Sequence, residues 1–343
     1  MTARPDLGRL LVYVVQRVFW TGFLIVGITL LTFGMTNVIP ADPARAAAGL
    51  EAREEQVQEM RRRMGLDRPL HVQYFGYMSS LARGDWGIAG RSQQPVLDEI
   101  KDHLPATLEL VAASMMLAVC LGIPMGILAA VLRGSLLDRV LQTLAIAGTA
   151  LPAFWLALLF QVAFFLYLRL LPAGGRYTII GTPPESVSGL YVVDALLAGN
   201  LTALKISLLH LVLPAVTLSL GLLANLARIT RKSVLNVLAR DFVRTARAKG
   251  LGGRAVIFRH VLKNAAIPII TITGLQTGYL FSSSVLVEVV FSWPGLGLYA
   301  VEAIGFLDFK AIMGATLVIA FIFVLINLVV DLSYAVIDPR IRY

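Results

Sequence analysis

Residues 241–268 have the sequence DFVRTARAKGLGGRAVIFRHVLKNAAIP and lie between two long apolar segments. The surrounding region, residues 228–263, contains ten Lys and Arg residues and a single acid, Asp241. The ten are Arg228, Arg231, Lys232, Arg240, Arg244, Arg247, Lys249, Arg254, Arg259 and Lys263. The composition favours helix up to Lys249, the glycines of the GLGG sequence interrupt it, and a helix can resume after them. The segment therefore predicts a basic helix–turn–helix hairpin, residues 228–264.

The composition of the whole chain is far from that of a soluble domain. Of its 343 residues, 57% are hydrophobic and only 15% are charged, with a mean hydropathy of +0.76; soluble domains carry about 25% charged residues. A polytopic membrane protein fits these values. The net charge of +9 then reflects basic loops that contact membrane lipid, and not a nucleic-acid partner. The single cysteine, Cys120, excludes an intrachain disulfide.

Six apolar segments are each long enough to cross the hydrocarbon core of a bilayer, which is about 30 Å thick. They are residues 10–38, 108–132, 140–168, 206–227, 265–287 and 312–334. Pro152 should kink the third segment. Two glycine pairs, Gly122 with Gly126 and Gly274 with Gly278, are spaced four apart, which is typical of closely packed membrane helices. The predicted fold class is all-α, a polytopic membrane protein with six transmembrane helices.

The chain divides into four predicted parts, and their charges set the expected topology. The parts are 1–39 (N-terminus and first transmembrane helix), 40–104 (extracytoplasmic region), 105–335 (five-helix core with the basic hairpin) and 336–343 (tail). Lys and Arg are concentrated in the hairpin and near both termini. The extracytoplasmic region is nearly neutral and should contain a solvent-facing helix over residues 51–64. Since basic loops stay in the cytoplasm, we expect the hairpin and both termini there.

Several sequence patterns for chemistry are absent. No Gly-Lys pair occurs in the chain, so it lacks the P-loop that holds ATP phosphates. The patterns H-E-x-x-H and G-x-S-x-G are also absent, and the four histidines are scattered without metal-ligand spacing. We therefore expect a transport subunit that is not an enzyme, with no catalytic residue, no metal site and no cofactor of its own.

The basic hairpin has features of a docking element. Ala246 and Ala248 precede Gly250, and such small residues would let the helix end sit deep in a groove of a partner protein. Arg244, Arg247 and Lys249 would supply charge complementarity at the rim of that groove. The alternative is a basic loop that fixes the topology and contacts lipid phosphates; composition alone does not separate the two.

Few polar residues lie within the predicted spans, and they are candidates for a translocation pathway. Asn225, Thr273, Gln276 and Glu288 are the residues selected, because polar groups inside a membrane often face a water-filled path. The alternative is hydrogen bonding between helices. For Glu288 a further alternative, capping the loop with the sequence SWPGLG, is favoured.

The pattern from Asp241 to Leu251, followed by His260, Leu262, Asn264 and Pro268, resembles the EAA loop of ABC importer permeases. The likeness is greatest for the B-type permease subunits of dipeptide, oligopeptide and nickel importers, also called binding-protein-dependent transport system inner-membrane components. Three further motifs resemble that subfamily. They are Leu104-Pro-Ala-Thr-Leu-Glu-Leu110, Asp85-Trp-Gly87 and Phe291-Ser-Trp-Pro-Gly-Leu-Gly297. Proline arrives only at Pro268, later than in the general permease pattern, as in the peptide subfamily.

The resemblance implies a type I ABC importer permease in the cytoplasmic membrane of a prokaryote. It implies that the EAA loop docks on a separate ATPase, with coupling residues Asp241, Arg244, Ala246, Arg247, Ala248, Lys249, Gly250, Leu251 and His260. The partners implied are a homologous second permease, two ATP-binding cassette subunits that bind ATP and Mg²⁺, and an extracytoplasmic substrate-binding protein. The expected substrate is a di- or oligopeptide, with a nickel chelate as the alternative. A self-contained secondary transporter is the alternative of another class, although no span carries charges suited to a proton relay.

Overall fold

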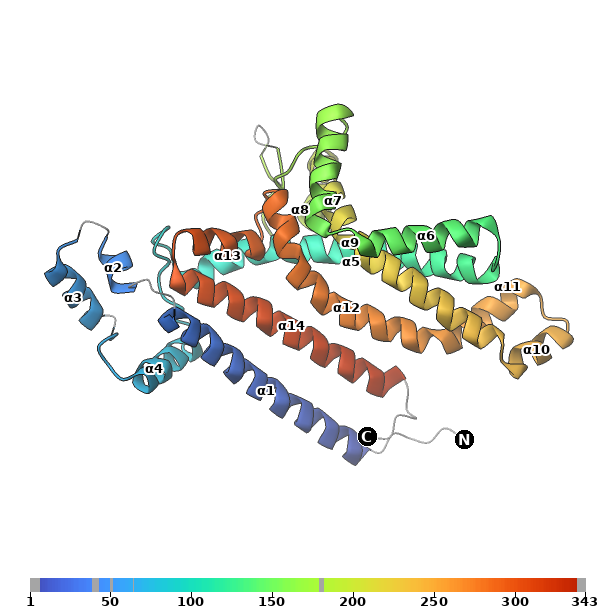
Figure 1. Ribbon diagram of the computed structural model, residues 1–343, viewed down its shortest axis with the longest axis horizontal. Coiled ribbons are helices and arrows are strands. Elements are labelled where there is room, and N and C mark those ends of the chain that lie inside the picture. The colour runs from blue at the N-terminus through green and yellow to red at the C-terminus, as the bar shows by residue number, and fades with distance from the viewer. Residues whose placement is uncertain (1–6, 39–42, 50–51, 64, 179–181, 338–343) are drawn as a thin grey trace.

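The computed structural model describes residues 7–38, 43–49, 52–63, 65–178 and 182–337 (Figure 1). The helices are α1 (Leu7–Val38), α2 (Pro43–Ala48), α3 (Glu54–Arg63), α4 (Leu70–Ala82), α5 (Val96–Val131), α6 (Leu136–Ala150), α7 (Ala153–Phe160), η1 (Gln161–Tyr167), α8 (Tyr191–Leu197), α9 (Leu201–Leu238), α10 (Asp241–Ala248), α11 (Gly253–Ala255), η2 (Val256–Val261), α12 (Leu262–Val290), α13 (Leu296–Gly305) and α14 (Phe309–Ile337). Within those ranges the β-type pairing is limited to one isolated bridge, between Ile88 and Pro95. The all-α prediction is confirmed.

Two long helices, α5 and α9, form the centre of the molecule, and glycines allow their close approach. A Cβ atom added to Gly122 would lie 2.9 Å from the Leu223 carbonyl oxygen, and one added to Gly126 would lie 2.5 Å from that of Ala227. Any larger residue would push the two backbones apart. The predicted packing role of this pair is confirmed. Gly278 of α12 likewise faces the Phe323 ring of α14, 2.8 Å from its nearest atom.

The third predicted span is broken rather than kinked. It consists of α6 and of α7 continued by η1, and these two parts meet at 104°. The break lies at Leu151 and Pro152, where Leu151 has extended backbone angles, because a proline disfavours helical geometry in the residue before it and donates no hydrogen bond. Five helices in the described ranges are long and apolar enough to cross a membrane, and the bent pair would make a sixth.

Several helices extend beyond the predicted apolar segments. The helix containing the second span begins at Val96, twelve residues before the apolar segment, and α9 continues to Leu238, into the basic region. The predicted solvent-facing helix over residues 51–64 is confirmed as α3. A further helix in this region, α4, was not predicted; it packs on α1 and carries exposed apolar side chains.

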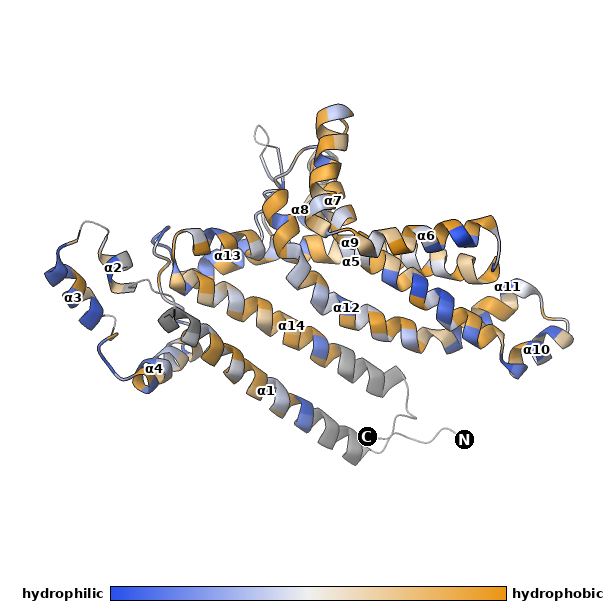
Figure 2. Ribbon diagram, in the orientation of Figure 1, coloured by the Kyte–Doolittle hydropathy of each residue, from blue (hydrophilic) through white to orange (hydrophobic). Residues whose placement is uncertain are grey.

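The molecule is elongated, and its two ends differ (Figure 1). The start of α1, the end of α14 and the α10–α11 hairpin share one end, whereas α2, α3 and the start of α14 lie at the other. Figure 2 shows the long helices as mainly apolar and α3 and α10 as largely polar. Residues 1–6 and 338–343, with the basic residues expected there, lie outside the described part of the chain.

Candidate functional site

The basic hairpin folds as predicted, with Gly250 at its turn. Helix α10 ends at Ala248, and the Gly250 and Leu251 amides donate to the Arg247 and Ala246 carbonyls at 2.9 and 3.3 Å. Gly250 has φ +80°, and no atom lies within 4 Å of where its Cβ would be. Glycine is therefore required here for its left-handed backbone and not for lack of space, as is usual one residue after a helix end.

The hairpin has an apolar core of its own. Val243 and Ala246 of α10 pack with Val256 and Val261 of η2 and with Val234 near the end of α9. Ala246 is only 7% exposed. Ala246 therefore packs inside the hairpin itself, and the expectation that this helix end enters a partner's groove stays a prediction. Ala248, by contrast, is exposed.

The outer surface of the hairpin combines apolar and basic side chains. Phe242, Leu251 and Phe258 are 43, 41 and 69% exposed. The surrounding predicted residues Asp241, Arg244, Arg247, Lys249 and Gly250 are all exposed, and His260 is half-buried. Asp241 and Arg244 form a solvent-exposed ion pair at 3.8 Å, which contributes little. Sequence analysis did not select Phe242 and Phe258, although aromatic residues among charged neighbours on an exposed helix were a usable signal.

A buried ion pair holds the base of the hairpin to the neighbouring helix. Arg231 of α9 donates two hydrogen bonds to Asp138 of α6, at 2.8 and 2.9 Å. Asp138 also accepts from the Gly134 amide and the Gln142 side chain, at 3.0 and 2.9 Å. Ser135 caps the start of α6 by accepting from the Asp138 amide. The pair joins the part of α9 that extends into the basic region to the first turn of α6, and neither residue was selected from the sequence.

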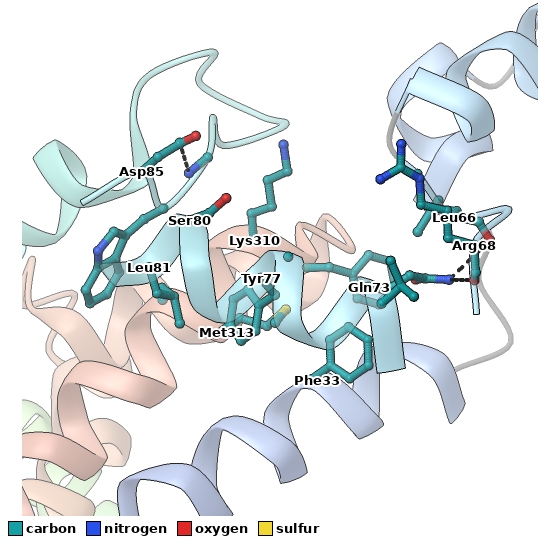
Figure 3. Close-up of a pocket in the computed structure, with 17 residues that line it drawn as sticks. Phe33, Leu66, Arg68, Gln73, Tyr77, Ser80, Leu81, Asp85, Lys310 and Met313 are labelled. Carbon is teal, nitrogen blue, oxygen red and sulfur yellow. Dashed lines mark hydrogen bonds between the residues drawn. The ribbon is translucent and has the colours of Figure 1, made fainter. Parts of the chain in front are cut away.

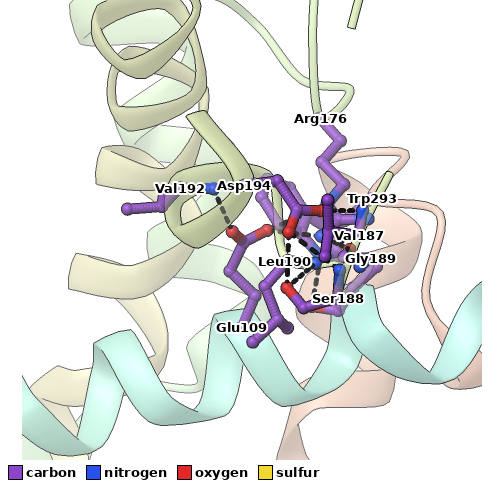
Figure 4. Close-up of polar contacts among 10 residues, drawn as sticks. Glu109, Arg176, Val187, Ser188, Gly189, Leu190, Val192, Asp194 and Trp293 are labelled. Carbon is purple, nitrogen blue, oxygen red and sulfur yellow. Dashed lines mark hydrogen bonds and ion pairs between the residues drawn. The ribbon is translucent and has the colours of Figure 1, made fainter. Parts of the chain in front are cut away.

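A second ion pair, buried more deeply, joins α5 to the loop that follows η1 (Figure 4). Arg176, in the loop after η1, donates to Glu109 of α5 at 2.9 and 2.7 Å and to the Gly189 carbonyl at 2.6 Å. Its guanidinium lies 3.8 Å from the Tyr191 ring centroid, within cation–π range. Glu109 also accepts from the Val192 amide at 2.7 Å. One charged pair thus joins α5, the loop and the start of α8.

Asp194 of α8 organises the rest of this loop. It accepts hydrogen bonds from the Val187, Ser188 and Gly189 amides and from the Ser188 hydroxyl. Burial alone would raise the pKa of this carboxyl, but the hydrogen bonds from Ser188, Val187 and Gly189 outweigh burial and hold the pKa below its ordinary value. The loop is therefore fixed by an ionised, fully hydrogen-bonded carboxylate.

Glu288 caps a helix instead of lining a pathway. Its side chain is completely buried and accepts from the Gly297 and Leu298 amides at 2.7 and 3.1 Å, at the start of α13. The Thr107 and Ser284 hydroxyls donate to it at 2.8 and 3.0 Å. The selection of Glu288 as a pathway residue is therefore corrected, and the capping alternative holds.

The same contacts explain two of the sequence motifs. A Cβ on Gly295 would lie 2.5 Å from both the Glu288 carboxylate and the Thr107 hydroxyl. Trp293 donates from its indole nitrogen to the Ala106 carbonyl at 2.9 Å. The SWPGLG and LPATLEL segments therefore form one buried unit, where the end of α12 meets α5.

The other three pathway candidates remain partly exposed. Asn225 accepts from Arg228 on its own helix, at 2.5 Å. Thr273 donates to the Ile269 carbonyl one turn earlier, at 2.8 Å, and Gln276 is half-buried on the same helix. These contacts lie within single helices, so they neither join two helices nor define a path.

Comparison with known proteins covers nearly the whole chain. The family described as binding-protein-dependent transport system inner membrane component matches residues 122–343, and its N-terminal family matches residues 10–111. The probable D,D-dipeptide transport system permease of Escherichia coli is 45% identical over 95% of this chain and 96% of its own length. The dipeptide transport system permease of Alkalihalophilus pseudofirmus is 42% identical over 97% of this chain and 100% of its own length. The Escherichia coli glutathione transport system permease is 38% identical, covering 96% and 99% of the two chains.

A solved structure supports the fold. A chain of the methionine ABC transporter MetNI, in an inward-facing conformation, superposes with a TM-score of 0.50 at 16% identity, over 68% of this chain and 93% of its own. With the family matches and the helical membrane architecture, the assignment is clear: this chain belongs to the binding-protein-dependent transport system inner membrane components, the membrane-spanning permease subunits of ABC importers.

Proposed function

We propose that this chain forms half of a translocation pathway for di- or oligopeptides and couples that pathway to ATP hydrolysis on a separate subunit. The observation that carries the coupling role is the exposed surface of the basic hairpin. Phe242, Leu251 and Phe258 are exposed apolar side chains of the hairpin, and its exposed Arg and Lys side chains lie close to them in the sequence. Exposed aromatic side chains together with arginine are typical of a protein interface.

The hairpin is built to transmit displacement to the membrane helices. Its apolar core includes Val234 of α9 together with Ala265 and Ile269 of α12. The hairpin and the adjoining ends of α9 and α12 are thus packed as one body. A partner that moved the hairpin would move both helices with it, because packed cores resist continuous deformation.

The proposed complex contains a homologous second permease, two ATPase subunits and an extracytoplasmic binding protein. The basic hairpin and both termini are proposed to lie in the cytoplasm of a bacterium, in accord with the charge distribution. The region over residues 40–104, at the opposite end, is proposed to contact the binding protein. Asn225, Thr273 and Gln276 are proposed to face the pathway once the second permease is present.

The proposed substrate class follows the names of the relatives. The three described above carry D,D-dipeptide, dipeptide and glutathione in their names, and all of these are peptides. Nickel-chelate transport remains the alternative. Uptake of a labelled dipeptide, competed by unlabelled peptide and not by a nickel chelate, would support the peptide proposal; the reverse pattern would contradict it.

Gly250→Asp tests the coupling role. The variant permease would be reconstituted with its partner subunits, and ATPase activity stimulated by loaded binding protein would be measured with uptake. We expect both to fall at least tenfold while membrane insertion is preserved, because the turn needs φ +80° and the hairpin surface must fit closely.

Gly252 supplies a matched control in the same turn. It has ordinary helix-entry angles, φ −61° and ψ 147°, and open space at its Cβ position. Gly252→Ala should therefore keep nearly normal coupling, whereas Gly250→Ala should already be impaired. Normal transport by Gly250→Asp would contradict the coupling assignment.

A further inference from the structure

A cavity of about 400 Å³ lies where α1, α4 and the start of α14 converge, away from the basic hairpin (Figure 3). Phe33, Val72, Leu81 and Met313 contribute apolar side chains to its lining. The exposed apolar residues Leu31 of α1 and Phe75 of α4, both 69% exposed, continue the apolar surface nearby. Exposed apolar side chains thus lie on both helices beside the cavity, and Leu31 belongs to the membrane-spanning part of α1.

Two cationic side chains line the same cavity from different segments. Lys310 is in the first turn of α14, and Arg68 precedes α4; Figure 3 shows both rising towards the same side of the cavity. Neither forms an ion pair with any described residue, whereas the neighbouring Arg45, Arg63, Arg91 and Lys101 all do.

The acids near these cations are engaged elsewhere. Asp85 lines the cavity but accepts from the Gly87 amide at 3.0 Å. Asp308, two residues before Lys310, accepts from the Gly90, Arg91 and Ala311 amides. Lys310 also lies at a helix N-terminus, where the helix dipole disfavours a cation. Arg68 and Lys310 therefore outnumber Asp85 in the cavity lining, and this excess of positive charge favours an anion from outside the chain.

The Asp85-Trp86-Gly87 motif positions Lys310. Gly87 has φ +83°, and a Cβ there would lie 2.7 Å from Cδ of Lys310, so the lysine stem lies directly on the glycine backbone. Tyr77 also lines the cavity, and its hydroxyl is buried beside the Thr32 hydroxyl of α1. It is a third donor available to a ligand.

We propose that this cavity binds one anionic phospholipid. Its phosphate lies between Lys310 and Arg68, Tyr77 donates to its polar backbone, and its acyl chains follow the apolar lining out to α1 and α4. A soluble anion would use the cations but would gain nothing from the apolar lining. This proposal concerns a site remote from the hairpin and does not depend on the transported substrate.

The test compares purified variants by their thermal stability with added lipid. Phosphatidylglycerol, phosphatidylcholine and inorganic phosphate would each be titrated against the wild type, Lys310→Gln, Arg68→Gln and the double variant. Arg83→Gln is the matched control, because Arg83 is exposed in the same region outside the cavity. We expect phosphatidylglycerol to stabilise the wild type and Arg83→Gln, with the apparent affinity falling about fivefold for each cation removed.

Met313→Trp provides a second variant that keeps both cations and fills the cavity. Phosphatidylglycerol should no longer raise the thermal stability of this variant. Native mass spectrometry should show that the lipid which copurifies with the wild type is absent from it. Equal stabilisation of the double variant, or equal effects of phosphate and phosphatidylglycerol, would overturn the proposal. A third outcome would also overturn it. If the double variant bound the binding protein more weakly in lipid-free detergent but was stabilised by lipid as well as the wild type, the cavity would be a protein docking site.

Discussion

The Glu109–Arg176 and Asp138–Arg231 ion pairs of this permease stabilise two regions of the molecule in different ways. Both side chains of the Glu109–Arg176 pair are 6% exposed, and the pair is extended by the Gly189 carbonyl, the Val192 amide and the Tyr191 ring. In the Asp138–Arg231 pair the aspartate is 3% exposed but the arginine is 22% exposed. Apart from the partner arginine, the aspartate's hydrogen bonds come from its own helix region.

This difference indicates which end of the permease can move. The Glu109–Arg176 pair crosslinks a helix, a loop and a second helix, so separating them would leave charges buried without partners. The Asp138–Arg231 pair joins only α6 to α9, and its arginine already contacts solvent. We therefore expect the end that carries the basic hairpin to rearrange during transport while the region around Glu109 and Arg176 moves as a block.

The largest effect is expected from Arg176→Ala. Removing the guanidinium leaves Glu109 buried and unpaired, which costs about 3–5 kcal/mol of unfolding free energy. Thermal or denaturant unfolding of the purified protein would measure the loss.

Lys101→Met is the matched comparison on the same helix, α5. Lys101 pairs with Asp98 at 2.7 Å, but the two side chains are 64 and 58% exposed, so the loss should not exceed about 0.5 kcal/mol. If Arg176→Ala and Lys101→Met lost similar amounts of unfolding free energy, burial would not be what makes the Glu109–Arg176 pair stronger than the Asp98–Lys101 pair. Replacing both Glu109 and Arg176 by leucine and methionine should recover much of the stability.

Asp138→Asn should have an intermediate effect, with a loss of about 2 kcal/mol. Asparagine keeps the size of the side chain but removes the charge that Arg231 contacts with two hydrogen bonds. We also expect weaker coupling, measured as transport per ATP hydrolysed, because α6 would no longer follow the base of the hairpin.

A double-mutant cycle with Arg231→Gln tests whether the effect belongs to the pair. The interaction free energy should be about 1–2 kcal/mol. If the two single changes were simply additive, the pair would not be the link between α6 and α9.

Sequence patterns predicted the features of this fold that depend on local spacing. Apolar length identified the spans, the spacing of Gly122 and Gly126 identified a packing surface, and the glycines after Lys249 identified the hairpin turn. The prediction failed where distant segments meet. Nothing adjacent to Arg176 in the sequence indicates that it pairs with Glu109, and Ala246 could not be assigned to the hairpin core before its position relative to Val256 was known. For Glu288 the sequence favoured the capping role that the structure shows, but it did not indicate the four donors, which come from three segments.

The smallest effect on stability is expected from a change at Asp194. It tests whether the loop between η1 and α8 depends on more than the Glu109–Arg176 ion pair. The pKa of Asp194 lies below its ordinary value of 3.8, so the ionised form stabilises the fold. That contribution is complete above about pH 4 and is lost as the pH falls through the lower folded pKa. Asp194→Asn should therefore cost about 1 kcal/mol near neutral pH and abolish this acid dependence. Hydrogen exchange of the amides of Ser188 and Gly189 would measure this acid dependence, with the wild type losing protection relative to the variant as the pH falls below about 4. Equal pH dependence in both proteins would mean that Glu109 and Arg176 hold the loop without Asp194.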